Sequence, residues 1–136
     1  MIRQLRLAVT VEDYDEAVAF YRDLLGMPLL DVWSSPDGGR GVLLDAGRGT
    51  LELTDPKNAA FIDEVEVGRR VAGHVRVALE VDDARAMTAA AVEGGAELVA
   101  EPTETLWRSL NARLEGPGDL QLTLFEELAE PPTAWR

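Results

Sequence analysis

The chain carries the same strand, helix and strand pattern twice, about seventy residues apart. Residues 6–30 read RLAVTVEDYDEAVAFYRDLLGMPLL, and residues 76–102 read RVALEVDDARAMTAAAVEGGAELVAEP. An offset of 70 aligns three pairs near the start of each copy, Arg6 with Arg76, Val11 with Val81 and Asp13 with Asp83. An offset of 71 then aligns Leu51-Glu52-Leu53 with Leu122-Thr123-Leu124. Self-similarity at a fixed spacing predicts two copies of one structural unit.

The first unit begins with residues 5–11, where apolar and polar side chains alternate as in a strand. In this pattern Leu5, Leu7, Val9 and Val11 face the helix that follows, and Arg6 faces the opposite side. Asp13 and Glu16 have the spacing of a capping box, which predicts a helix that continues until Gly26. Three strands follow, at residues 28–34, 40–46 and 50–54, with turn-forming residues between them.

The second unit has the same order of elements. It comprises a strand at 74–81, an alanine-rich helix at 84–93 and strands at 96–100, 106–114 and 120–126, with a turn at 116–118. The connector at 55–72 contains a possible short helix at 57–66, whose polarity suggests a surface crossing. We therefore predict an α+β fold of two tandem βαβββ modules in a single domain. Module one spans about 2–54, module two about 73–126 and a tail 127–136.

The residue composition excludes several classes of function. Cysteine is absent, so the chain offers no disulfide, thiolate metal ligand or cysteine nucleophile. The formal net charge of −12 would repel nucleic acid and anionic lipid headgroups, so neither is an expected partner. No apolar run is long enough for a secretion signal or a membrane span, which makes the cytoplasm the expected location. With His74 as the single histidine, nothing indicates a nucleophilic triad, and no catalytic residue is assigned.

The segment at 13–26, DYDEAVAFYRDLLG, together with its second copy, resembles the vicinal oxygen chelate superfamily. This superfamily includes glyoxalase I, the bleomycin-resistance proteins, the fosfomycin-resistance enzymes and the extradiol dioxygenases, and the resemblance covers about residues 5–126. It implies that the strands curl into a cup-shaped, incomplete barrel with the helices outside and a ligand site inside. It also implies a homodimer, because half-cups in this family often complete each other across a two-fold axis.

The resemblance further implies four metal-ligand positions, which in this chain hold Arg6, Glu52, Arg76 and Thr123. Only Glu52 can bind a divalent ion, because a guanidinium group is cationic and has no lone pair to offer. His74 shares the expected inward direction of Arg76 but lies two residues too early, so a shift in register would be needed to recruit it. We therefore expect no metal and no cofactor.

The same positions predict a polar floor for an organic ligand. Arg6, Glu52 and Arg76 would compensate one another in charge, with Thr123 and Gln121 as neutral hydrogen-bond partners. Alternatively, Glu52 only neutralises buried arginines and holds the two modules in register. Trp33, Trp107 and Phe61 are candidates for the cup wall, or the tryptophans pack in a core or dimer interface. Ser109, Asn111 and Arg113 alternate along one strand and could face the cavity with Trp107.

These residues predict a metal-independent protein that binds a small aromatic or amphipathic molecule, such as a drug or natural product, as in antibiotic resistance. The predicted ligand-binding residues are Arg6, Trp33, Glu52, Phe61, Arg76, Trp107, Ser109, Asn111 and Thr123. A metal-dependent lyase or isomerase of the glyoxalase or dioxygenase type is the alternative. A weaker third possibility is a metal-independent isomerase or cyclase in which Glu52 is the general base. The tail, with two prolines and no periodic pattern, is interpreted as flexible or packed against a partner.

Overall fold

The computed structural model describes residues 1–24, 26–116 and 120–128, except for the side chains of Phe20 and Leu24. Its strands are β1 (Gln4–Thr10), β2 (Leu29–Ser34), β3 (Arg40–Asp45), β4 (Thr50–Thr54), β5 (Val75–Glu80), β6 (Glu97–Glu104), β7 (Ser109–Gly116) and β8 (Leu120–Glu127). Its helices are α1 (Tyr14–Val18), the π-helix η1 (Ala19–Leu24), α2 (Pro56–Glu66) and α3 (Ala84–Glu93). Most of the predicted turn at 116–118 and the tail from residue 129 lie outside the described residues.

The strands form one 8-stranded mixed sheet in the order β2-β3-β4-β1-β5-β8-β7-β6. β1 and β5 pair antiparallel at the centre, and each runs parallel to the last strand of its own module. The order read outward from β1 therefore matches the order read outward from β5. In the described residues β2 and β6 remain edges, so the sheet is not closed into a barrel. This arrangement confirms the predicted α+β fold of two βαβββ modules in an incomplete barrel.

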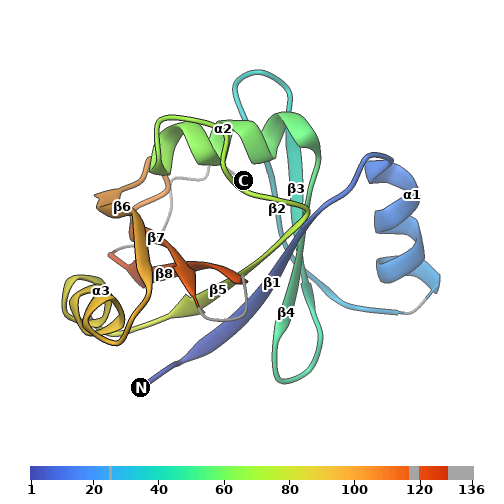
Figure 1. Ribbon diagram of the computed structural model, residues 1–136. Coiled ribbons are helices and arrows are strands. Elements are labelled where there is room, and N and C mark those ends of the chain that lie inside the picture. Colours follow the sequence, from blue (N-terminus) through green and yellow to red (C-terminus); the bar gives the residue numbers. More distant parts are fainter. Residues whose placement is uncertain (25, 117–119, 129–136) are drawn as a thin grey trace.

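Each module has its own apolar core beneath its own helix. In the first module, Tyr14 and Val18 of α1 pack against Val42, Leu44 and Leu53. In the second module, the core around α3 consists of Val81, Ala84, Leu110, Ala112, Leu114 and Leu124. Figure 1 shows α1 and α3 on opposite flanks of the sheet, with α2 across the top between the two halves.

The first helix begins as predicted and then changes type. The Asp13 carboxylate accepts a hydrogen bond from the backbone N–H of Glu16 at 3.0 Å, which confirms the N-cap. The α-helix ends at Val18 and continues as the wider η1 to Leu24, so the predicted helix is present but changes from the α to the π type along its length. Over two turns, an α-helix and a π-helix place the same apolar residues on nearly the same face. The pattern of apolar residues therefore cannot distinguish the two helix types here.

The outer face of β1 is only partly covered. Leu5 and Leu7, which were predicted to face the helix, are 46% and 37% exposed. Only Val9 and Val11, at the other end of this alternating run, pack against the core beneath α1. The short α1 therefore covers one end of the strand, and the prediction was wrong for Leu5 and Leu7.

The connector helix α2 exposes one face, with Lys57, Ala60 and Glu64, as a surface crossing would, but its other face is buried. Its polar residues Asn58, Asp63 and Glu66 are buried, because α2 lies across the sheet and turns these side chains inward.

β7 begins at Ser109, later than predicted, and Trp107 lies in the preceding turn beside Arg108, whose φ is 64°. No helix in the described residues has the length and apolarity that crossing a membrane requires.

Candidate functional site

A cavity of about 580 Å³ lies between the sheet and α2. Its lining comes from both modules and from α2, and it includes all nine residues predicted to bind ligand. These are Arg6, Trp33, Glu52, Phe61, Arg76, Trp107, Ser109, Asn111 and Thr123. Asn58 and Glu66 of α2 also line it, although sequence reasoning did not select them.

Strand register explains why residues distant in sequence meet on this face. Ala8 of β1 lies opposite both Glu52 of β4 and Arg76 of β5. One step along the sheet, Ala78 of β5 lies opposite Thr123 of β8. Residues directly opposite each other in neighbouring strands project to the same face, so this register carries the side chains of Glu52, Arg76 and Thr123 toward the cavity.

Arg76 is the centre of the polar floor. Its Nη1 donates to Oγ1 of Thr123 at 3.0 Å, and its Nη2 donates to Oε2 of Glu52 at 3.4 Å. All three residues are buried. The Arg76 guanidinium therefore joins β4 of one module to β8 of the other through these two hydrogen bonds.

Arg6 and Gln121 differ from the predicted floor. The Arg6 guanidinium lies 4.8 Å from the centroid of the Phe125 ring, and its Nη2 is 3.8 Å from Oε1 of Glu127, away from Glu52. Gln121 accepts from Nη1 of Arg113 at 3.1 Å and donates to Glu115 at 3.0 Å. The Arg6 side chain extends across the sheet to residues of β8, and the Gln121 side chain bonds to residues of the neighbouring β7. Neither side chain forms a hydrogen bond with Arg76 or Glu52 in the described residues.

Trp33 forms a fixed part of the cavity wall. Its Nε1 donates to Oδ1 of Asn58 on α2 at 2.9 Å. The indole ring lies against the backbone of β3, where a Cβ added at Gly41 would be 2.2 Å from Nε1. Trp33 has therefore already paired its N–H and offers the cavity its apolar ring surface. Trp107 and Phe61 are likewise half-buried and line the same cavity.

A buried ionic cluster holds α2 against β7. Arg113 is 0% exposed, with Nη1 2.8 Å from Oδ1 of Asp63 and Nε 3.1 Å from Oε1 of Glu66. The second oxygen of Glu66 accepts from Nδ2 of Asn111 at 3.0 Å. Arg113 was predicted as a possible cavity residue, but Asp63 and Glu66 take up its charge, and it does not line the cavity.

Asp63 keeps its charge despite complete burial. Burial raises the pKa of this carboxyl, but hydrogen bonds from the N–H groups of Ala72 and Val71, the charge of Arg113 and a hydrogen bond from Arg70 outweigh it. The net effect is a pKa below the ordinary value. The segment after α2 is thereby tied to the helix, with both backbone donors 2.8 Å from Oδ2 of Asp63.

The model of the Glyoxalase/Bleomycin resistance protein/Dioxygenase superfamily matches residues 3–124 of the chain. The chain belongs to this superfamily. No curated protein sequence is similar enough to count as a match.

Solved structures of this superfamily fold share the architecture. A hypothetical protein from Bacillus halodurans C-125 is 18% identical with a TM-score of 0.71, and the match covers 97% of this chain and 99% of that one. A variant of methylmalonyl-CoA epimerase from Streptomyces coelicolor, in complex with 2-nitronate-propionyl-CoA, is 22% identical with a TM-score of 0.66, covering 96% and 97%. A mutant of 4-hydroxymandelate synthase from Streptomyces coelicolor is 28% identical with a TM-score of 0.64, covering 96% of this chain and 39% of that one.

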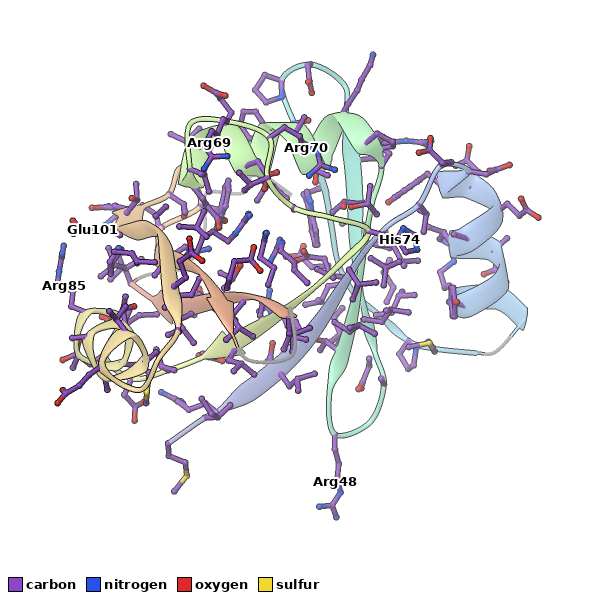
Figure 2. All side chains as sticks on the ribbon, viewed as in Figure 1. Arg48, Arg69, Arg70, His74, Arg85 and Glu101 are labelled. Atoms are coloured by element: carbon purple, nitrogen blue, oxygen red, sulfur yellow. The ribbon has the colours of Figure 1, made fainter. Side chains whose placement is uncertain are left out.

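The superfamily's four metal-ligand positions do not fit a divalent ion in this member. Glu52 already accepts from Arg76, and the Arg76 guanidinium itself bonds Thr123, so cationic nitrogen occupies the place between these side chains. His74 is exposed and lies outside the cavity lining (Figure 2). Within residues 1–24, 26–116 and 120–128, no three histidine or carboxylate side chains gather as a metal site would require.

Proposed function

We propose that this superfamily member binds a small aromatic or amphipathic organic molecule in the cavity, without a metal and without converting it. The observation that carries this proposal is the aromatic wall, Trp33, Phe61 and Trp107, beside the polar floor around Arg76. The volume of about 580 Å³ lies within the range of small-molecule sites. A drug or natural product held in this way would be sequestered, as the bleomycin-resistance branch of the family suggests.

Two of the carboxylates favour binding over proton transfer. Glu52 accepts from Arg76, and Glu66 accepts from both Asn111 and Arg113. These bonds occupy carboxylate oxygens that a general base would have to offer to a substrate proton. Ser109 donates its hydroxyl proton to Oδ1 of Asn111 at 2.6 Å, and an amide oxygen is too weak a base to activate a nucleophile.

Trp107→Ala is expected to weaken ligand binding about tenfold or more, because burial of a large aromatic surface contributes a few kcal/mol. The measurement is a titration of wild type and variant with a panel of flat drugs and natural products, followed by tryptophan fluorescence. Arg48→Ala, at an exposed turn, is the control and should bind as wild type does. Failure of every compound to change the emission of the wild type would contradict the proposal.

Purified protein is expected to contain far less than one equivalent of Zn, Fe, Mn or Ni, because the donors around Glu52 do not fit these ions. Elemental analysis of protein prepared without added metal measures this directly. The alternative function, a metal-dependent lyase or isomerase, predicts a stoichiometric metal that is lost in Glu52→Gln. That result would replace the binding proposal with the enzyme.

We also propose that the chain forms a homodimer. Leu5, Leu7 and Val75 expose apolar surface on the outer face of the two central strands. A second copy is a natural partner for such a patch in a symmetric assembly. Size-exclusion chromatography with light scattering should give twice the chain mass of 14.8 kDa. A monomer at tens of micromolar, about the usual working range of this method, would reject the dimer.

A further inference from the structure

The cavity wall carries more negative than positive charge. Among the residues that the structure describes, five carboxylates and two guanidinium groups line it. The carboxylates are those of Asp31, Glu52, Glu66, Glu80 and Glu127, and the guanidinium groups are those of Arg6 and Arg76. A concave, partly desolvated surface with such an excess concentrates cations and repels anions.

Ion pairs within the site do not remove this excess. Arg76 is committed to Glu52, and Arg6 lies within 3.8 Å of Glu127. Arg113 stands behind Glu66, and Arg70 pairs with the neighbouring Asp63 at 2.8 Å, so that cluster is neutral and adds no positive charge to the cavity. The remaining negative charge therefore belongs to the cavity as a whole.

Glu80 is the carboxylate best placed to meet a ligand. It lies at the end of β5, half-buried, and lines the cavity. Within the described part of the chain its side chain has no hydrogen-bond or ion-pair partner, whereas Glu52, Glu66 and Glu127 each have one. Its oxygens therefore remain able to accept hydrogen bonds from a bound molecule.

The corner beside Glu80 already stabilises a cation. Glu80 is paired in register with Phe125 of β8, and the Arg6 guanidinium lies over the Phe125 ring at 4.8 Å. An aromatic face flanked by carboxylates attracts positive charge by both cation–π and ionic interactions. Glu80 and Glu127 carry two negative charges there and Arg6 carries one positive charge. One more cationic group would therefore balance the charge of this corner.

We propose that the cavity selects molecules whose flat apolar body carries a protonated amine or amidine, and that the Glu80 carboxylate accepts the hydrogen bonds of that group. This inference rests on the proposed binding function and adds the charge of the ligand. It also sets this cavity apart from one suited to an anionic substrate, because a carboxylate or phosphate would meet the excess negative charge.

Three naphthalene probes of similar size test the inference: 2-naphthylmethylamine as the cation, 2-naphthylmethanol as the neutral analogue and 2-naphthoate as the anion. Calorimetric titration should give the tightest binding for the amine and the weakest for the anion. Glu80→Gln should weaken binding of the amine about tenfold, the effect of losing a hydrogen bond to a charged group, and leave the alcohol unchanged.

Glu101→Gln is the matched control, because it removes the same unit of charge from an exposed side chain at the edge strand β6, outside the cavity lining (Figure 2). It should bind all three probes as wild type does. Equal binding of amine and alcohol would overturn the inference and leave the proposed function standing. Equal losses in Glu80→Gln and Glu101→Gln would overturn the role of Glu80. If no probe bound the wild type while unrelated flat compounds did, the charge preference would be wrong; if nothing bound, the proposed function would fail.

Discussion

Arg113→Ala is expected to lower the free energy of unfolding by about 3–5 kcal/mol, which is a large share of the stability of a small domain. The reason is the burial of its partners. Asp63 and Glu66 are both buried carboxylates within 3.1 Å of Arg113, and alanine would leave them facing each other across a cavity. Removing one partner of a buried ionic cluster costs more than the net value of the interaction, because the remaining charges stay desolvated.

Urea denaturation of wild type and variant measures this loss. Arg48→Ala serves as the control, since Figure 2 shows Arg48 extending from the turn between β3 and β4, away from the body of the protein. Its effect should stay within about 0.5 kcal/mol. A loss in Arg113→Ala no larger than this would contradict the buried ionic cluster.

Acid titration provides a second measurement on the same cluster. The pKa of Asp63 is lowered in the folded protein, so its stabilising contribution is present above the unfolded value of about 3.9 and is lost as pH falls through the folded pKa. In Arg113→Ala, one of the causes of the lowered pKa is gone. The variant should therefore lose less of its remaining stability than wild type does on acidification below about pH 4.

The fold could be predicted from the sequence because the repeat carries its own local signals. Asp13 was predicted to cap the first helix, and Asp83, at the equivalent position of the second copy, caps the second one in the same way. The symmetric strand order then follows from two copies of one module. The π-helical turn and the exposed Leu5 were not predictable in the same way, because both depend on how far a helix extends over the sheet.

The residues that line the cavity could be predicted from the sequence, but several of their hydrogen bonds and ion pairs could not. Alternation along strands fixes the face of a side chain, which is why the seven predicted residues on strands line the cavity; Phe61 lies on α2 and Trp107 in the turn before β7. Alternation does not fix the reach of a long side chain, and Arg6 therefore contacts Phe125 and Glu127 rather than Glu52. Asn58 and Glu66 were missed because polar residues on a connector usually face solvent. Asn58, Ile62 and Glu66 follow one another at intervals of four residues, which places them on one face of a helix with the apolar Ile62. This spacing was the signal in the sequence that they face inward.

Gly41→Ala is expected to weaken binding of a flat ligand at least about tenfold, the loss that follows when a large aromatic surface leaves a binding site. The added Cβ would lie 2.2 Å from Nε1 of Trp33 and 2.3 Å from its Cε2, so the indole must move. Movement also breaks the hydrogen bond from Nε1 to Asn58. Near-ultraviolet circular dichroism should report the altered tryptophan environment, and the ligand titration should report the loss of affinity.

Gly73→Ala is the matched control, because a Cβ at Gly73 would meet nothing within 4 Å. A double-mutant cycle then separates the steric cause from a general effect on β3. In a Trp33→Ala background, the alanine at position 41 no longer has a ring to displace, so it should change affinity little. If Gly41→Ala lowered ligand affinity as much in that background as in wild type, its effect would not arise from displacement of the Trp33 ring. The fixed indole would then cease to support the proposed binding of flat molecules.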